Sequence, residues 1–183
     1  MPQERGTNFL TELLKFALIA IIIVVPVRLY VAKPFLVSGA SMDPTFSTGQ
    51  YLIIDELSYH FAEPERGDVI IFRYPKDPSQ YFIKRVIGLP GETVSIQNNE
   101  LYITDASGAR MHLDEPYVTN QGNGADISVT LPAGEYFVMG DNRPESSDSR
   151  SWGLLPRQNI VGRVFLRLLP PQTAAFFPGK ETQ

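Results

Sequence analysis

Cysteine is absent from the 183-residue sequence, and histidine occurs only at positions 60 and 112. Without thiols the chain has no disulfide scaffold, no cysteine nucleophile and no cysteine metal site. The two histidines form neither an HExxH motif nor any other paired-ligand spacing, so a metal site is not expected. No other cofactor is implied by the sequence.

A basic surface stripe is also lacking. The net charge of −4 is unevenly placed, because residues 1–33 carry +2 and the remainder carries −6. An acidic domain of this kind argues against nucleic acid as a partner. Hydrophobic residues make up 43% of the chain and charged residues 20%, which is typical of a globular protein large enough to bury a core.

One long hydrophobic segment is present, near the N-terminus. Its uninterrupted apolar part, residues 16–27, is too short alone to cross a bilayer, but residues 13–31 give 19 positions with Lys15 and Arg28 near the two headgroup layers. The segment has no polar face, no Ala-x-Ala cleavage site follows it, and residues 21–25 are all β-branched. A spanning helix therefore fits better than an interfacial helix, a cleavable signal peptide or a buried helix. We predict a transmembrane anchor over residues 13–33, preceded by a short segment of residues 1–12.

The rest of the chain has the pattern of a β domain. Short runs rich in Val, Ile, Tyr and Phe are separated by turn-forming pairs such as Pro90-Gly91 and Asn98-Asn99. This predicts a mainly β fold, a compact all-β barrel or sandwich over residues 34–174, with a C-terminal tail at 175–183. Residues 75–80 and 120–125 are expected to be exposed loops. The predicted strands are residues 51–57, 68–74, 81–89, 92–97, 100–104, 127–131, 135–140 and 159–169.

The possible arrangements for nucleophilic catalysis can be narrowed by excluding those whose motifs are missing. Neither histidine has the motif support that a Ser-His-Asp triad needs, and the GxSxG elbow is absent. A Ser–Lys pair remains: Ser41 stands among small residues just after the hydrophobic segment, and Lys84 is the only lysine inside a strongly apolar strand. If Lys84 faces inward, desolvation lowers its pKa and lets a neutral amine take the serine proton. Strand alternation leaves open whether Lys84 or Arg85 is the inward residue.

Three segments, SGASMDPT, FIKRVIGLPGE and GDNRPESSDSRSWG, together resemble the type I signal peptidases. The resemblance spans the chain in the expected order, and the third segment is long and specific. It implies a catalytic β domain of the signal peptidase type, with Ser41 as nucleophile and Lys84 as general base. It also implies that Ser146 hydrogen-bonds and orients the lysine, and that Asp148 and Arg150 form a supporting pair.

The resemblance extends to the oxyanion hole, topology and partners. The backbone N–H of Ser41 is expected to be one oxyanion donor. Where some family members carry a donating serine two residues before the nucleophile, this chain has Gly39, whose main-chain N–H is our prediction for the second donor. The expected partners are membrane lipid and the signal peptides of exported pre-proteins. The N-terminus is expected in the cytosol, with the β domain on the extracytoplasmic side.

Two other functions compete at this point. A self-cleaving, repressor-like Ser–Lys protease would place a DNA-binding domain where this chain has a hydrophobic segment. A membrane-tethered, non-catalytic β module that binds exported proteins would keep its function after replacement of Ser41 and Lys84.

Overall fold

The computed structural model describes residues 9–26, 33–122 and 124–180. Residues 27–32 of the predicted anchor lie outside the described residues, as do residues 1–8 and 181–183. The N-terminal helix α1, Phe9–Pro26, begins inside the predicted N-terminal segment. No helix among the described residues has both the length and the apolar character needed to span a membrane.

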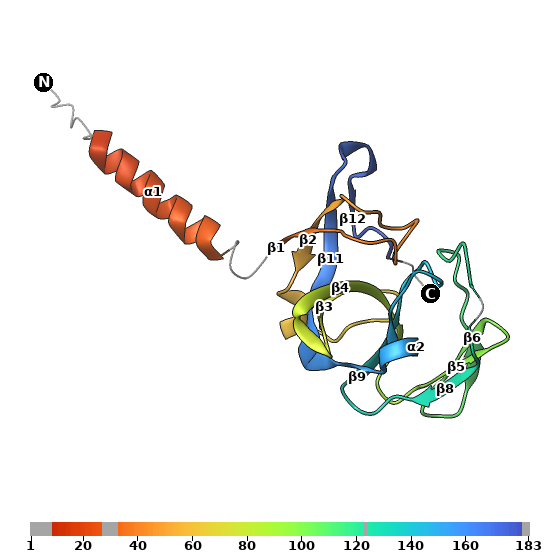
Figure 1. The fold of residues 1–183 in the computed structure, drawn as a ribbon. Helices are drawn as coiled ribbons and strands as arrows, with labels where there is room; N and C mark the ends of the chain where they lie inside the picture. Colours follow the sequence, from red (N-terminus) through yellow and green to blue (C-terminus); the bar gives the residue numbers. More distant parts are fainter. Residues whose placement is uncertain (1–8, 27–32, 123, 181–183) are drawn as a thin grey trace, which may run out of the picture.

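Strands dominate the remainder of the described chain (Figure 1). Besides α1, the only α-helix described is the short α2, Ser149–Trp152, and three single 3₁₀ turns lie at 58–60, 157–159 and 171–173. The strands are β1 Lys33–Leu36, β2 Tyr51–Asp55, β3 Val69–Tyr74, β4 Asp77–Gly88, β5 Thr93–Gln97, β6 Glu100–Thr104, β7 Arg110–His112, β8 Ile127–Thr130, β9 Glu135–Met139, β10 Leu155–Pro156, β11 Ile160–Leu169 and β12 Ala175–Phe176.

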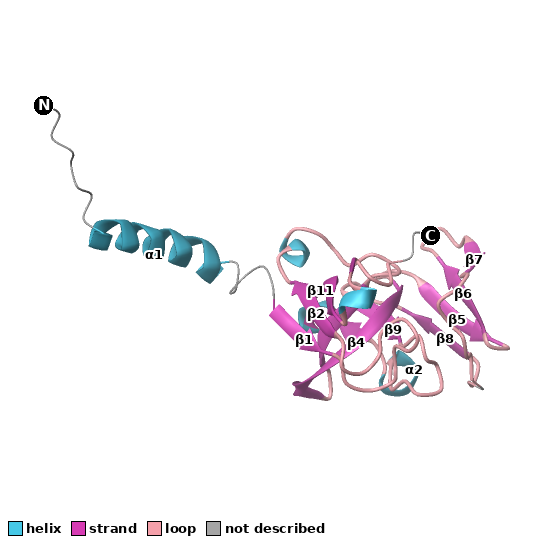
Figure 2. Cartoon of the chain, turned by 90° about the horizontal axis from the view of Figure 1, so that it is seen from above, coloured by secondary structure: helices cyan, strands magenta, loops and turns pink. Residues whose placement is uncertain are grey.

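The strands form two separate sheets (Figure 2). The larger sheet has the order β1-β2-β11-β3-β4-β9-β10, with β12 attached to β11. The smaller sheet has the order β7-β6-β5-β8. Neither path returns to its first strand among the described residues, so the barrel-like domain expected from the sequence is replaced by two open sheets. The mainly β class is confirmed.

All eight predicted strands are present, but several boundaries differ. Residues 75–80 were expected to be a loop; instead the β3–β4 hairpin turns at residues 75–76, because Tyr74 pairs with Asp77. Residues 77–80 have the composition of a turn, but pairing between the two strands of the hairpin makes them part of β4. The asparagine pair at 98–99 makes the predicted turn between β5 and β6, and both residues have the positive φ that a two-residue hairpin of this type requires.

Four short strands had no sequence signal. They are β1, β7, β10 and β12, each only two to four residues long. β12 begins at Ala175 and pairs with β11, so residues 175–180, predicted as a tail, belong to the same domain. Such short strands are stabilised by the neighbour they pair with, and local propensity hardly marks them.

Three buried clusters hold the sheets together. One lies beneath β1, β2, β3 and β11 and includes Met42 and Phe46 from the loop that carries Ser41. A second joins the smaller sheet to β9 through Phe137 and Met139, and a third packs β3, β4 and β9 against Tyr59 and Leu155. Because Met42 and Phe46 are almost completely buried, the Ser41 loop is attached to the core on its C-terminal side.

Candidate active site

The loop after β1 holds Ser41 at the surface of the core. Val37, on one side of the serine, and Met42, on the other, are buried, while Ser41 itself is half-buried. The Asn142 side chain donates to the Ala40 carbonyl over 3.0 Å, and the Asn142 N–H donates to the Ser41 carbonyl over 3.1 Å. Both bonds come from Asn142, so this one residue holds the backbone of the loop at Ala40 and Ser41.

Lys84 lies opposite this serine on β4. Its Nζ donates to Ser41 Oγ over 2.6 Å and to the carbonyl of Ile83 over 2.9 Å. The lysine is only 4% exposed, and its Nζ also lies 5.5 Å from the ring centre of Phe82. Lys84 and Arg85 are both buried, on opposite faces of β4. Strand alternation left open which of the two points inward, and the structure shows that both do.

Burial changes the acidity of this lysine. Desolvation is the largest effect and lowers the pKa of Lys84 from 10.5 to about 8, because a buried ammonium loses its hydration. The carboxylates of Asp148 and Asp141 oppose that decrease, whereas Arg150 adds to it. At a pH near 8 a large share of the amine is neutral and can accept a proton from a hydroxyl 2.6 Å away.

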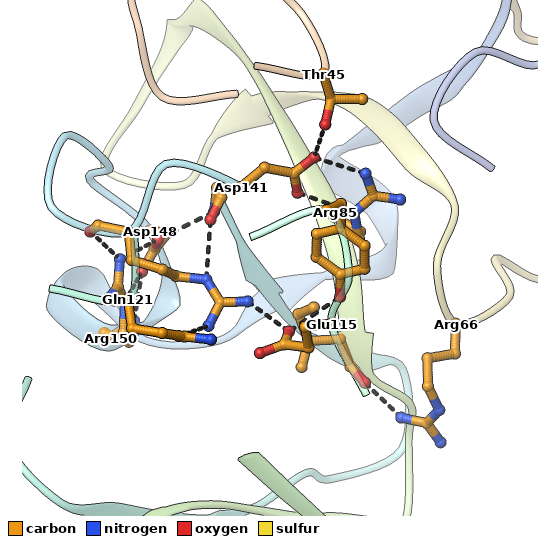
Figure 3. A network of polar contacts seen from close by, with 12 residues as sticks. Thr45, Arg66, Arg85, Glu115, Gln121, Asp141, Asp148 and Arg150 are labelled. Carbon is orange, nitrogen blue, oxygen red and sulfur yellow. Dashed lines mark hydrogen bonds and ion pairs between the residues drawn. The ribbon is translucent and has the colours of Figure 1, made fainter. Parts of the chain in front are cut away.

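Arg85, the next residue on β4, forms a fully buried ion pair with Asp141. Its Nε donates to Asp141 Oδ1 over 2.9 Å and its Nη2 to Oδ2 over 2.6 Å, and neither residue is exposed. The Thr45 hydroxyl donates to the same Oδ2 over 2.6 Å, so the carboxylate connects β4 to the Ser41 loop (Figure 3). The Tyr117 ring covers the guanidinium at 3.8 Å.

A second ion pair braces the segment that follows β9. Arg150 donates to Asp148 through Nε and Nη2, both over 2.8 Å (Figure 3). The Asp148 carboxylate also accepts the N–H of Gly140 over 3.1 Å and caps α2 through the N–H of Arg150. Arg143, in the same segment, is paired with Glu115 and donates to the carbonyl of Gly140.

At Gly140 this segment comes close to the backbone of Ser41. A Cβ at position 140 would lie 2.3 Å from the Ser41 carbonyl oxygen and 2.4 Å from Ser146 Oγ. Only glycine fits there, because no other residue lets the two backbones come so close. Ser146 Oγ is buried and has no hydrogen-bond partner among the described residues, so its predicted bond to Lys84 is not formed in this structure.

A model of the family described as "Signal peptidase, peptidase S26" matches residues 10–169. The chain belongs to this family. The probable signal peptidase I-1 of Synechocystis sp. is 38% identical over 176 residues, covering 92% of this chain and 87% of that protein. Signal peptidase I of Bacillus licheniformis is 34% identical over 171 residues, with 88% and 91% coverage. The crystal structure of a signal peptidase I from Enterococcus faecalis V583 is 35% identical, with a TM-score of 0.48, and covers 56% of this chain and 97% of that one.

The two main-chain N–H groups predicted as oxyanion donors differ in whether they already have a hydrogen-bond acceptor. The N–H of Ser41 has no acceptor among the described residues, as a donor that awaits an oxyanion would. The N–H of Gly39 donates to Thr48 Oγ1 over 3.0 Å, and that hydroxyl donates back to the Gly39 carbonyl over 3.1 Å. The Gly39 N–H therefore already has an acceptor in this structure, and its role as second oxyanion donor stays a prediction.

A cavity of about 240 Å³ opens over the Ser41–Lys84 contact. It is lined on one side by β1 and the Ser41 loop and on the other by residues 81–84 of β4. A neighbouring cavity of about 400 Å³ shares Phe35 and Tyr81 with it, and these two rings meet edge to face at 6.3 Å. Two adjoining cavities along one groove suit an extended chain with separate sites for different side chains.

The family segments contained site residues that sequence reasoning did not single out. Arg85 was considered only as an alternative to Lys84, and Asp141 and Asn142 lie in the third family segment without an assigned role. Thr45, four residues after the nucleophile, carried no signal of its own. For Asp141, the one indication in the sequence of a role in the site was its position directly after an apolar strand. No group of three or more potential metal ligands occurs among the described residues, and the two histidines are exposed and do not line the cavity at Ser41.

Proposed function

We propose that this member of the signal peptidase family is a membrane-tethered serine endopeptidase that removes signal peptides from exported pre-proteins. The observation that carries the proposal is the 2.6 Å contact between Nζ of the buried Lys84 and Ser41 Oγ, two residues that line one cavity. The named relatives are signal peptidases, which supports the substrate class. A neutral buried lysine beside a hydroxyl is what this chemistry requires.

The reaction proceeds through an acyl-enzyme. Neutral Lys84 takes the proton of Ser41 Oγ as the oxygen attacks the scissile carbonyl, and the Ser41 N–H stabilises the resulting oxyanion. The lysine then gives its proton to the leaving amine. In the second half Lys84 removes a proton from a water that attacks the acyl carbonyl, and Ser41 is released unchanged. No metal or cofactor takes part in these steps.

Ser146 fits a supporting role in this mechanism. Its buried hydroxyl has no partner among the described residues, which is an unfavourable arrangement for a polar atom. A shift of the Lys84 ammonium towards this hydroxyl would satisfy it when the lysine becomes charged. The ion pair of Asp148 with Arg150 would hold the backbone of this segment in place during that shift.

The substrate would bind as an added strand. β1 is the end strand of the larger sheet, and residues 81–84 of β4 pair with β3 on one side but with no described strand on the other. An extended peptide placed between these edges would have its hydrogen bonds satisfied by main-chain groups and its side chains in the two cavities. The small residues at 39 and 40 leave room for its backbone.

Membrane attachment is the remaining part of the proposal. The large apolar side chains described on α1 are exposed, with Phe9 at 82% and Phe16 at 73%. On the β domain, exposed apolar side chains gather on neighbouring strands and loop ends: Leu36, Tyr51, Leu168, Leu169 and Phe176. A lipid surface would cover both groups and place the cleft where signal peptides emerge.

Cleavage assays on the full chain in detergent test the catalytic part. Ser41→Ala and Lys84→Ala are expected to lower kcat by at least about a thousandfold on a peptide with alanine at the first and third positions before the cut. The matched controls Ser128→Ala and Lys76→Ala, on exposed residues outside the cleft, leave cleavage unchanged. Undiminished cleavage by Ser41→Ala would refute the proposal.

Attachment is tested separately. Because the chain has no cysteine, a single cysteine introduced before or after residues 13–33 reports its side of the membrane by labelling with an impermeant thiol reagent. The proposal requires the protein to stay in the pellet on alkaline extraction, with position 3 labelled only after lysis and an exposed position in the β domain labelled in intact cells.

A further inference from the structure

The C-terminal residues of the described chain return to the active site. Pro178 is buried, and the carbonyl of Gly179 accepts a hydrogen bond from Nη1 of Arg85, the neighbour of Lys84 in the chain. A Cβ at Gly179 would lie 2.8 Å from Thr45 Cγ2 and 3.1 Å from the ring of Phe46. The glycine also has a φ of +76°, which other residues rarely adopt.

This contact completes the surroundings of a fully buried charge. Asp141 takes Nε and Nη2 of Arg85, but Nη1 is shared between two carbonyls, those of Gly67 and Gly179. A buried guanidinium donor without a partner is costly, and an opening beside it admits water. Loss of Gly179 would leave Nη1 with Gly67 alone.

Contacts outside the cleft hold the C-terminal residues in this position. The N–H of Phe177 donates to the carbonyl of Phe165 in β11 over 2.7 Å, and the Arg163 guanidinium lies 5.2 Å from the centre of the Phe177 ring. Lys180 adds an exposed ion pair with Glu65 at 3.4 Å. Residues 178–180 are thus held against both the nucleophile loop and the base of β4.

We propose that Pro178 and Gly179 are a positioning element of the active site: the Gly179 carbonyl holds Arg85, and Arg85 with its partner Asp141 holds Thr45 and so the loop that carries Ser41. The inference rests on the proposed Ser41–Lys84 peptidase. The element acts through Arg85 on one side and through its packing on Thr45 and Phe46 on the other.

The pKa of Lys84 can report on this element without interference from charges in the C-terminal residues. The charged groups that act on its amine are Asp148, Asp141 and Arg150, and none of them lies in the C-terminal residues. Loss of residues 179–183 is therefore expected to act on Lys84 by letting the Ser41 loop move away from it, which admits water to the amine. Added water favours the ammonium, so the pKa of Lys84 rises and the acid limb of kcat/KM moves to higher pH.

The test compares a chain that ends at Pro178 with a chain that ends at Lys180, both assayed in detergent on the alanine-containing peptide. The chain ending at Pro178 is expected to lose about tenfold or more in kcat with little change in KM, and its acid limb moves upward. The chain ending at Lys180 and the variant Lys180→Ala behave as wild type. Gly179→Ala, which keeps the chain length, reproduces the loss.

Two outcomes would overturn the inference. One is a wild-type kcat and pH profile in both the chain ending at Pro178 and Gly179→Ala. The other is a lower thermal midpoint with kcat per folded molecule and the acid limb unchanged, which would make the segment structural only. Ser41→Ala is run alongside: if it still cleaves, the proposed function fails, whereas an inactive Ser41→Ala with a fully active chain ending at Pro178 removes this inference alone.

Discussion

Lys84 Nζ lies 2.6 Å from Ser41 Oγ although the two residues are 43 positions apart in the chain. The lysine is on a strand in the middle of the larger sheet, and the serine is on a loop held by Asn142 and by buried Met42. Their contact is a product of the sheet order, and it brings a desolvated amine to a hydroxyl that solvent reaches.

The pH dependence of cleavage follows from the acidity of Lys84. In the proposed mechanism only the neutral amine accepts the serine proton, so kcat/KM is expected to rise with pH and reach half its maximum near the lysine pKa of about 8. Peptide cleavage measured from pH 5 to about 10 checks this. Lys84→Arg is expected to be inactive throughout, because a guanidinium stays charged. A flat profile would contradict the assignment.

The same lysine is predicted to reduce stability at neutral pH. Its pKa is about 8 in the folded state and 10.5 without burial, so below pH 8 the full penalty of burying the ammonium applies. Between these values the unfolded chain binds more protons, and stability rises with pH until the penalty, about 3 kcal/mol, is gone. Lys84→Met is expected to raise the thermal midpoint at pH 6–7, with the gain vanishing towards pH 10.5. An equal gain at every pH would argue for packing instead.

Removal of the buried Asp141 charge is predicted to be strongly destabilising. Asp141→Asn leaves the Arg85 guanidinium without a counter-charge at a site of no exposure, which is expected to cost about 3–5 kcal/mol of unfolding free energy. Chemical denaturation measures the loss. Glu65→Gln breaks only the exposed pair with Lys180 and is expected to cost less than about 1 kcal/mol. Similar losses for both variants would contradict the prediction.

Gly140→Ala tests the close approach of Gly140 to the Ser41 backbone. The new methyl group would overlap the Ser41 carbonyl oxygen at 2.3 Å, so the loop must move. A displacement of about 1 Å at the nucleophile is expected to lower kcat by about a hundredfold. Gly124→Ala is the control, because nothing lies within 4 Å of the added atom. Peptide cleavage compares the two, and equal activities would show that the loop adjusts without cost.

Several elements could be predicted from the sequence because their signals are local. The β-branched run of β3 and the asparagine pair between β5 and β6 each mark a strand or a turn within a few residues. Ser41 and Lys84 were predicted as catalytic residues partly by elimination and partly by resemblance. The strand β12 and the contact of Gly179 with Arg85 had no such mark, because they depend on residues far apart in the chain.

By itself the sequence determined that the domain is mainly β, that thiol chemistry is excluded, and that one serine and one lysine stand in a family pattern. The tertiary structure alone decided that Lys84 and Arg85 are both buried, that Gly39 gives its N–H to Thr48, and that two open sheets replace a barrel. The physical reason is that composition and spacing reflect short-range preferences. Desolvation and the partner of each buried polar group depend instead on which strands lie side by side.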